Sequence, residues 1–435
     1  MHDTVDVRFI RRASSALCAA SVVVLLGACA HPTPPDSIEP KSWVIENVAA
    51  KTTAELYADL IAPAVFERSG SKVIDGYTVE SGNLRMPDKS MGSLITVRAK
   101  DGSLTAIIEV PGKQGILRVN ADGKSIFTRE KYPDSSVEDS VISTDNLLMA
   151  PSSSKTTADN EPRVIEVLAG FSRAYANVVV DPHAFSLAEM ETVNLALRNS
   201  LVTNVSMKLA GIQIVEPNYL ASKETLHQLL TIFSSGIDQY APDVVAGFFN
   251  GEGSPAVGYG NMPGRTSVNA GSFVFRHEIG HNASGFHCSP SDPASGYGFG
   301  YNTSIMCGAW YGPYYSTPLV RDENGQPRGD ALTADMARAF RENAMRLSTY
   351  TASPATNFRK TGSTITKITF GWDQSNDAVR YDVYRETPAQ PQPQKIAETV
   401  SLTYTAADSS GRSMYFVKAI NSAANESKPS NKASR

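Results

Sequence analysis

The stretch Ser272–His287 reads SFVFRHEIGHNASGFH and holds three of the seven histidines in the chain. His277 and His281 stand four positions apart, so on a helix both imidazoles project from one face and can reach a single ion. Glu278 is rotated from His277 by roughly 100° about such a helix, which places its carboxylate beside the ion. His287 completes the set if the chain turns sharply after the helix. The stretch therefore predicts a helix that carries a metal site.

Three neutral nitrogen ligands with a fourth position left open are typical of catalytic zinc, so we expect one Zn²⁺ ion. Glu278 is then the candidate general base for a water activated by the metal, and it can pass the proton to the leaving amine. A His-Glu-x-x-His pair on its own can be an accident of an exposed helix. Here a third histidine follows, and Phe273, Val274 and Phe275 lead into the pair, which predicts a buried active-site helix.

The same residues resemble the signature of the metzincin zinc peptidases, His-Glu-x-x-His-x-x-Gly-x-x-His followed by a Met-turn, and are most similar to the reprolysin-like (adamalysin-like) branch. The resemblance covers residues 163–350 and implies an α/β catalytic domain, with a mixed sheet and the active-site helix. Ser284 stands where the family has glycine, and Gly285 follows it. Either Ser284 takes up a left-handed backbone, or the turn moves by one residue to Gly285.

The segment Asn302–Gly308 matches the place of the Met-turn. The resemblance implies that Met306 forms the hydrophobic floor under the zinc, and the alternative is an ordinary core methionine. Some metzincins carry a tyrosine two residues after this methionine, where this chain has Gly308. Trp310 and Tyr311 follow it and are candidates for lining the substrate cleft.

Residues 256–260 lie where metzincins place an antiparallel edge strand. A peptide substrate would add to this edge through backbone hydrogen bonds, which makes Val257, Gly258 and Tyr259 further candidates for the substrate cleft.

Four cysteines are present: Cys18, Cys29, Cys288 and Cys307. The first falls in an N-terminal export signal, and disulfides persist in exported proteins. The resemblance brings the segment after the third histidine close to the Met-turn, which implies a disulfide between Cys288 and Cys307. The alternatives are two free thiols, or one cysteine that acts as a ligand.

The N-terminus predicts export. Arginines precede a mostly apolar run, Ala16–Ala28, which is too short to span a bilayer comfortably. The run ends in Leu26–Cys29 (LGAC), which resembles a bacterial lipobox with Cys29 as the lipidated residue. The alternative is a plain signal peptide cut at Ala28 or Ala30. We therefore expect an outer-membrane or cell-surface lipoprotein whose partner is the membrane through its lipid anchor, and otherwise a periplasmic or extracellular protein.

The expected fold class is multidomain: a β-rich N-terminal domain, an α/β metzincin catalytic domain and a C-terminal all-β sandwich. Asp101-Gly102 and Asp122-Gly123 stand between apolar runs and predict hairpins in the first domain, which is either a propeptide or a permanent accessory domain. In the central domain, Ser186 and Glu189 predict the start of a helix through a capping box. The expected boundaries are 1–29 signal peptide, 30–40 tether, 41–150 N-terminal domain, 151–162 linker, 163–350 catalytic domain and 353–435 C-terminal module.

Alternating apolar residues in the last part of the chain predict short strands, as in Ile368, Phe370 and Trp372. This pattern, with Tyr381 and the segment 415–421, resembles a fibronectin type III module.

The 435 residues are 41% hydrophobic and 19% charged, with a net charge of −4 and no basic block, which argues against nucleic acid as a partner. The leading hypothesis is a zinc-dependent endopeptidase that acts on proteins or peptides outside the cytoplasm. The alternatives are a zinc hydrolase of cell-wall amides and a surface adhesin that binds through the fibronectin-like module. Glu278 argues against the adhesin, because a scaffold does not need that carboxylate.

Overall fold

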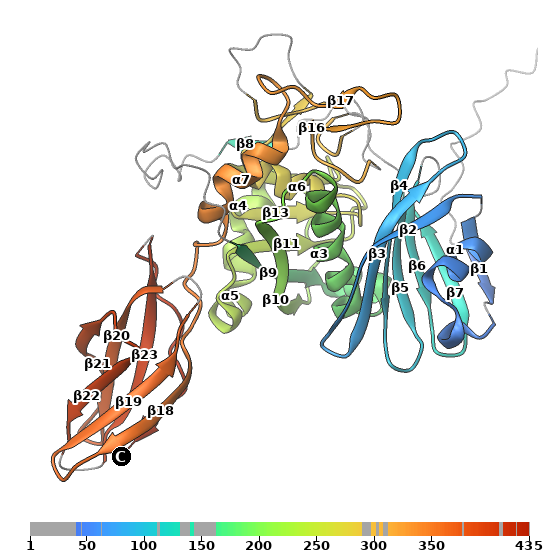
Figure 1. The fold of residues 1–435 in the computed structure, drawn as a ribbon. Helices are drawn as coiled ribbons and strands as arrows, with labels where there is room; N and C mark the ends of the chain where they lie inside the picture. Colours follow the sequence, from blue (N-terminus) through green and yellow to red (C-terminus); the bar gives the residue numbers. More distant parts are fainter. Residues whose placement is uncertain are drawn as a thin grey trace, which may run out of the picture. The chain divides into compact units, whose positions relative to one another are not determined.

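The computed structural model describes residues 41–44, 46–61, 63–110, 114–130, 140–142, 162–288, 297–301, 304–307, 312–375, 378–408, 412–422 and 424–434, all within one compact unit, Glu39–Arg435 (Figure 1). The predicted signal peptide with Cys29, the tether 30–40 and most of the linker 151–162 lie outside these residues. So do Trp310 and Tyr311. Within the described part, no helix has the length and apolar character needed to cross a membrane.

The N-terminal part forms a seven-stranded antiparallel sheet in the order β1-β7-β6-β5-β4-β3-β2. Asp101-Gly102 joins β4 to β5 and Asp122-Gly123 joins β6 to β7, so both predicted hairpins are confirmed. Leu56 of helix α1 packs on one face of the sheet, among leucine, isoleucine and valine side chains. The elements are β1 (Lys41–Val44), the 3-10 helix η1 (Val48–Ala50), α1 (Thr53–Ile61), β2 (Val65–Ile74), β3 (Tyr77–Arg85), β4 (Met91–Arg98), β5 (Leu104–Glu109), β6 (Gly115–Val119) and β7 (Lys124–Arg129).

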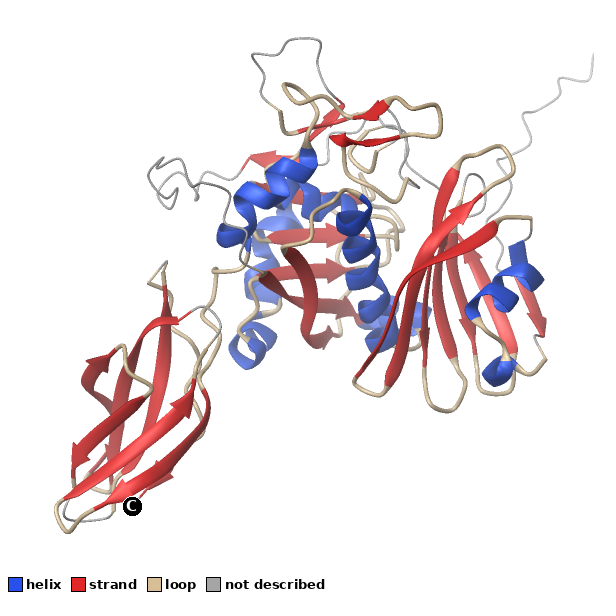
Figure 2. Ribbon diagram, viewed as in Figure 1, coloured by secondary structure: helices blue, strands red, loops and turns tan. Residues whose placement is uncertain are grey.

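The central part is built on a six-stranded mixed sheet in the order β10-β9-β11-β13-β12-β8. Strands β10, β9, β11 and β13 are parallel to one another, and β12 runs antiparallel to β13. Helices flank this sheet in Figure 2. The bounds are β8 (Ser140–Ile142), β9 (Arg163–Ser172), α2 (Arg173–Val179), α3 (Pro182–Asn199), β10 (Val205–Val215), α4 (Lys223–Ile232), α5 (Ser234–Tyr240), β11 (Val244–Phe248), β12 (Gly258–Met262), β13 (Thr266–Asn269), α6 (Phe275–Asn282), β14 (Phe286–Cys288), β15 (Phe299–Gly300), β16 (Thr317–Arg321), β17 (Pro327–Arg328) and α7 (Met336–Leu347).

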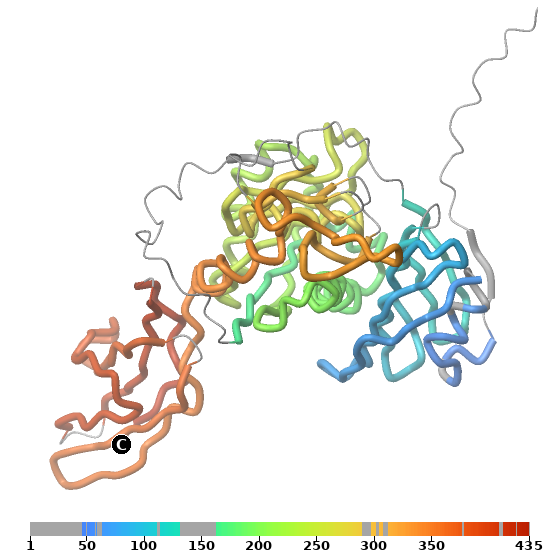
Figure 3. Tube along the Cα trace, turned by 45° about the horizontal axis from the view of Figure 1, so that its top comes forward, coloured from blue at the N-terminus to red at the C-terminus, as the bar shows by residue number. Residues whose placement is uncertain are grey.

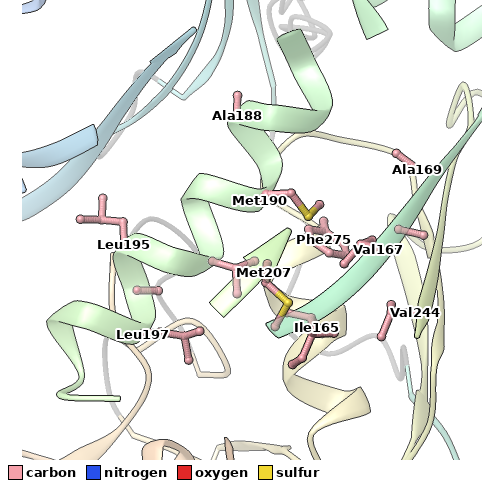
Figure 4. Packing of buried hydrophobic residues seen from close by; sticks show 14 of the residues in the cluster. Ile165, Val167, Ala169, Ala188, Met190, Leu195, Leu197, Met207, Val244 and Phe275 are labelled. Atoms are coloured by element: carbon pink, nitrogen blue, oxygen red, sulfur yellow. The ribbon is translucent and has the colours of Figure 1, made fainter. Parts of the chain in front are cut away.

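Apolar side chains on both faces of β9 hold these layers together. Ile165, Val167 and Ala169 contribute to a core shared with α3, α6 and α7, which Figure 4 shows from close by. Leu168 lies in a second core with residues of α4 and α5. Because successive side chains of a strand point to opposite faces, an apolar run such as that of β9 fits a strand covered on both sides.

The N-cap of helix α3 lies five residues before Ser186, the N-cap that the capping box predicts, so that prediction is wrong. Asp181 is the N-cap, and its Oδ1 accepts hydrogen bonds from the backbone N–H groups of His183 and Ala184, both at 3.0 Å. Pro182 occupies the first turn, where a missing N–H costs nothing. Ser186 therefore lies inside the helix, and its hydroxyl donates to the Pro182 carbonyl at 2.6 Å.

Two further sheets make up the C-terminal part, β18-β19-β22 and β21-β20-β23-β24. Their facing side chains form one core, in which Phe358 stacks on Phe370 and Trp372 meets Tyr381 edge to face. The strands are β18 (Thr356–Ser363), β19 (Lys367–Asp373), β20 (Ala378–Thr387), β21 (Gln390–Thr399), β22 (Thr403–Ala407), β23 (Met414–Asn421) and β24 (Ala433–Ser434). Figure 3 follows the chain through this part.

The expected fold class, centred on an α/β metzincin catalytic domain, is wrong. Of the residues that the structure describes, 44% lie in strands and 21% in helices, and the strands are divided among several sheets without a dominant α/β core. The physical reason is that helical periodicity identifies single helices, whereas the long strand-only regions on either side supply most of the regular structure.

Candidate metal centre

Three histidine side chains converge at the end of α6. His277 and His281 lie one turn apart on this helix, and both are 1% exposed. His287, on the short strand β14, returns to the same place and is partly buried. Its Nε2 lies 3.2 Å from Nε2 of His277 and 3.1 Å from Nε2 of His281. The structure thus brings together the three residues that the sequence predicts as ligands.

The donor set fits a tetrahedral zinc ion. Two zinc–nitrogen bonds of about 2.1 Å at the tetrahedral angle would place their nitrogens roughly 3.4 Å apart, close to the observed separations. Nδ1 of His277 lies 3.0 Å from the Ile305 carbonyl, and Nδ1 of His281 lies 2.7 Å from the Gly285 carbonyl. A carbonyl only accepts, so both Nδ1 atoms donate, and in a neutral imidazole this tautomer leaves the lone pair for a metal on Nε2.

The turn after α6 settles where the chain accommodates the missing family glycine. Ser284 has a φ of 74°, whereas Gly285 is absent from the positive-φ residues, so the first of the two expected alternatives holds. The Gly285 N–H donates to the Gly280 carbonyl at 2.8 Å, which closes the helix. This turn orients the Gly285 carbonyl toward His281 and sends the chain back toward the position of His287.

Met306 lies against the middle of helix α6. It is 1% exposed, and a Cβ built on Gly280 would lie 2.4 Å from its sulfur, so the methionine fills the space that this glycine leaves. The preceding residue, Ile305, supplies the carbonyl that orients His277. The segment 304–307 therefore supports the histidine site from below without providing a ligand.

Cys288 and Cys307 form a disulfide, with their Cα atoms 4.6 Å apart. The predicted bridge is confirmed, and the alternatives of two free thiols or a cysteine ligand are wrong. The bond joins the residue after His287 to the residue after Met306. It thus ties the third histidine to the segment that supports the first.

Glu278 lies beside the histidines, with its side chain fully buried. Two glycines of β12 approach its carboxylate: a Cβ on Gly258 would lie 2.4 Å from Oε1, and one on Gly260 would lie 3.0 Å from Oε2. No side chain larger than hydrogen fits at Gly258 without displacement. The strand backbone therefore passes directly over the candidate base.

The structure distributes the other cleft candidates unevenly. Val257 is partly buried against Phe273 and Val274, and Tyr259 is 6% exposed within the core that contains Phe249. The backbone of β12 pairs with β13 on one side and with β8 on the other, through Gly260↔Ser140 and its two following pairs. Strand β12 is therefore next to last in the sheet over Gly260–Met262, so of the expected edge strand 256–260 only Gly260 is covered by β8.

Sequence reasoning missed a buried ion pair and a partly buried glutamate that contact the segment around the start of α6. Arg276 directly precedes His277 and is fully buried, where it forms an ion pair with Glu109 of β5. Glu130, after β7, accepts hydrogen bonds from Ser272. The available signal was Arg276 itself, which directly follows the apolar residues Phe273, Val274 and Phe275. A buried arginine at such a position needs a charged partner.

No protein-family model matches the chain, and no curated protein matches it. Among solved structures, one described as a chaperone-substrate complex has a TM-score of 0.39 at 18% identity, over 59% of this chain and 45% of its own. This chain therefore spans less than half of that protein. A Fn3-like protein from Clostridium thermocellum has a TM-score of 0.17 at 24% identity, over 19% of this chain and 90% of its own. The structure of FN3tt has a TM-score of 0.17 at 16% identity, over 19% of this chain and 92% of its own.

Two sheets of residues 356–434 pack on one shared core, which fits the sandwich of the predicted fibronectin-like module. The names of the Fn3-like neighbours carry no activity for the histidine site.

Proposed function

We propose that the chain is a zinc-dependent endopeptidase. The observation that carries the proposal is the convergence of three Nε2 atoms, of His277, His281 and His287, beside the buried carboxylate of Glu278. Three protein ligands leave a coordination position for water, which is the arrangement of catalytic rather than structural zinc. The sequence signature, which resembles that of metzincins, supports the same proposal.

The chain's own residues supply the proton transfers. Zinc held by the three histidines provides Lewis acidity to the attacking water and to the peptide carbonyl. Glu278 takes the proton of that water as it attacks, and later delivers it to the amine that leaves. The carbonyls of Ile305 and Gly285 keep His277 and His281 in one tautomer, so that neither histidine competes with Glu278 as a proton carrier.

A peptide is the substrate that the neighbouring backbone favours. Strand β12 runs past Glu278, and its glycines at 258 and 260 let its own backbone lie against this carboxylate, so an extended chain added beside β12 would lie near the base. Its outer side already accepts one strand, β8, through three residue pairs. Strand addition at this position is therefore a geometry that the sheet supports.

Export is part of the proposal. The Cys288–Cys307 disulfide supports it, since disulfides persist outside the reducing cytoplasm. We propose that lipid on Cys29 anchors the protein to a membrane.

The experiment is a comparison of wild type with Glu278→Gln on a casein zymogram, with and without a chelator, together with zinc analysis of both proteins. We expect the variant to keep one zinc per chain and to lose peptidase activity by several orders of magnitude, because the ligands remain while the base is gone. Glu252→Gln, at an exposed glutamate, is the matched control and should be fully active.

Full activity of the Glu278→Gln protein would refute the mechanism. Clearing of cell-wall material without clearing of casein would replace the peptidase by a hydrolase of cell-wall amides.

A further inference from the structure

Two carboxylates of the N-terminal sheet contact the segment that carries the metal site. Glu109, at the end of β5, is fully buried and pairs with Arg276, whose side chain is 1% exposed. Its Oε2 also accepts a hydrogen bond from Ser93 at 2.7 Å. The N-terminal sheet thus provides the counter-charge for a residue next to His277.

The second carboxylate holds the entrance to the same helix. Glu130 follows β7, and its Oε1 accepts from the backbone N–H of Ser272 at 3.0 Å. Its Oε2 accepts from the Ser272 hydroxyl at 2.5 Å. Ser272 is 1% exposed and lies three residues before Phe275, the first residue of α6. We call Glu109 and Glu130 together the carboxylate clamp.

Arg276 transmits this contact to the metal site. A buried guanidinium that loses its partner costs several kcal/mol, so the helix is favoured only in the position where Arg276 meets Glu109. The Arg276 backbone is fixed as well, because its carbonyl accepts a hydrogen bond from Tyr315 at 2.7 Å. Rotation of this residue would move His277, its neighbour in the chain.

The N-terminal sheet also packs directly against helix α3. Apolar side chains of β3, β4, β5 and β6 belong to the same core as those of α3: Val79, Ile95, Val97, Ile107 and Ile116. Polar contacts continue the surface, since Glu191 of α3 accepts from Ser81 at 2.6 Å and lies 2.9 Å from Lys72. Removal of the sheet would expose this core to water.

We propose that residues 41–130 are a permanent part of the catalytic unit, and that Glu109 and Glu130 are positioning residues that orient α6 for metal binding. The proposal rests on the proposed zinc peptidase function. It replaces the propeptide alternative: cleavage between the two parts of the chain leaves the N-terminal sheet in place.

The first test introduces a specific protease site between residues 151 and 160 of the full-length protein. After complete cleavage, we expect the two fragments to co-elute in size-exclusion chromatography and to keep the zinc content of the uncut protein. Separation of a zinc-loaded, folded C-terminal fragment would overturn the proposal, because the sheet would then be dispensable.

The second test measures zinc affinity and hydrogen exchange of residues 272–282 in Glu109→Gln and Glu130→Gln. We expect zinc affinity to fall by about 10- to 100-fold, as for other groups that orient ligands, with faster exchange in this segment. Glu67→Gln is the matched control, because Glu67 pairs with Arg85 on the exposed part of the same sheet. Wild-type zinc affinity in both clamp variants would overturn the proposal.

A third variant guards against simple unfolding. The double change Glu109→Leu with Arg276→Met replaces the ion pair by apolar side chains, which often preserves stability. We expect the double variant to be folded and to bind zinc more weakly than wild type. The single variant Arg276→Lys, which keeps a positive charge opposite Glu109, should retain most of the wild-type zinc affinity. Unchanged zinc binding in the double variant would contradict a positioning role. If wild type binds no zinc, the proposed function fails, while co-elution and exchange still test the clamp.

Discussion

Substitution of Gly258 by alanine should separate catalysis from metal binding. The added Cβ would lie 2.3 Å from Cγ1 of Val274 and 2.4 Å from Oε1 of Glu278. Val274 is fully buried at the entrance of α6 and cannot retreat into solvent. Strand and carboxylate must therefore move apart, and the three atoms nearest to the new methyl group belong to Val274 and Glu278, not to a histidine.

The size of the effect follows from the overlap. Ordinary contact of a Cβ begins at 3.4 Å, so the Glu278 oxygen at 2.4 Å has to move by about 1 Å. A misplacement of this size costs on the order of 100-fold in rate. The forced repacking should also destabilise the fold by about 1–3 kcal/mol. The assay is kcat on a fluorogenic peptide, with zinc content and melting temperature measured on the same preparation.

Gly362→Ala is the matched control, because a Cβ there meets its first neighbour at 3.9 Å. This variant should keep the wild-type rate. If Gly258→Ala also turned over peptide at the wild-type rate with full zinc content, the assignment of Glu278 as the base beside this strand would be refuted.

Three further predictions follow from the site and its surroundings. Cys288→Ser should lower stability by about 3 kcal/mol, because the bridge closes a loop of 19 residues, and should weaken zinc binding; equal melting temperatures and zinc titrations would contradict this. Burial raises the pKa of Glu130 from 4.5 to about 7, with Glu109 adding to the rise and the Ser272 hydrogen bonds opposing it. The folded state therefore binds a proton that the unfolded state releases first, so stability should fall by about 3 kcal/mol as pH rises from about 4.5 to 7. Urea unfolding at several pH values should show that this fall of the unfolding free energy with pH is smaller in Glu130→Gln than in wild type. An equal fall in both proteins would exclude Glu130 as its source. Ser284→Gly should raise the unfolding free energy by up to about 1 kcal/mol, since glycine takes the left-handed φ without strain, whereas Ser284→Ala should not; equal effects would show that φ is not the cause.

Sequence spacing predicted the parts of the site that depend on short-range geometry. His277 and His281 converge because the period of a helix places positions i and i+4 on one face. The hairpins at Asp101-Gly102 and Asp122-Gly123 formed for a similar reason, since each turn depends on two adjacent residues. The disulfide required a resemblance as well, because its two cysteines are separated by 19 positions.

Long-range contacts escaped prediction. Nothing near Arg276 in the sequence identifies its partner, because Glu109 lies on a strand of another sheet. The start of α3 was misplaced because two capping signals compete, and the Asp181-Pro182 pair prevails over Ser186. The balance of strand and helix was predicted wrongly because one helix motif reports only on its own segment, whereas many of the strands lie in the parts before and after it.

The pairing of β8 with β12 has a consequence for any peptide that adds to this sheet. Ser140–Ile142 and Gly260–Met262 belong to one chain, so β8 pairs with β12 intramolecularly, without the loss of translational freedom that a separate peptide incurs. An incoming strand competes with β8 for the same backbone groups. Its apparent binding free energy is the free energy of its own addition less that of the β8 pairing it displaces. Peptides that bind this edge more weakly than the tethered strand gain little from it, and selectivity among extended substrates is set by how well each of them replaces three residues of the protein itself.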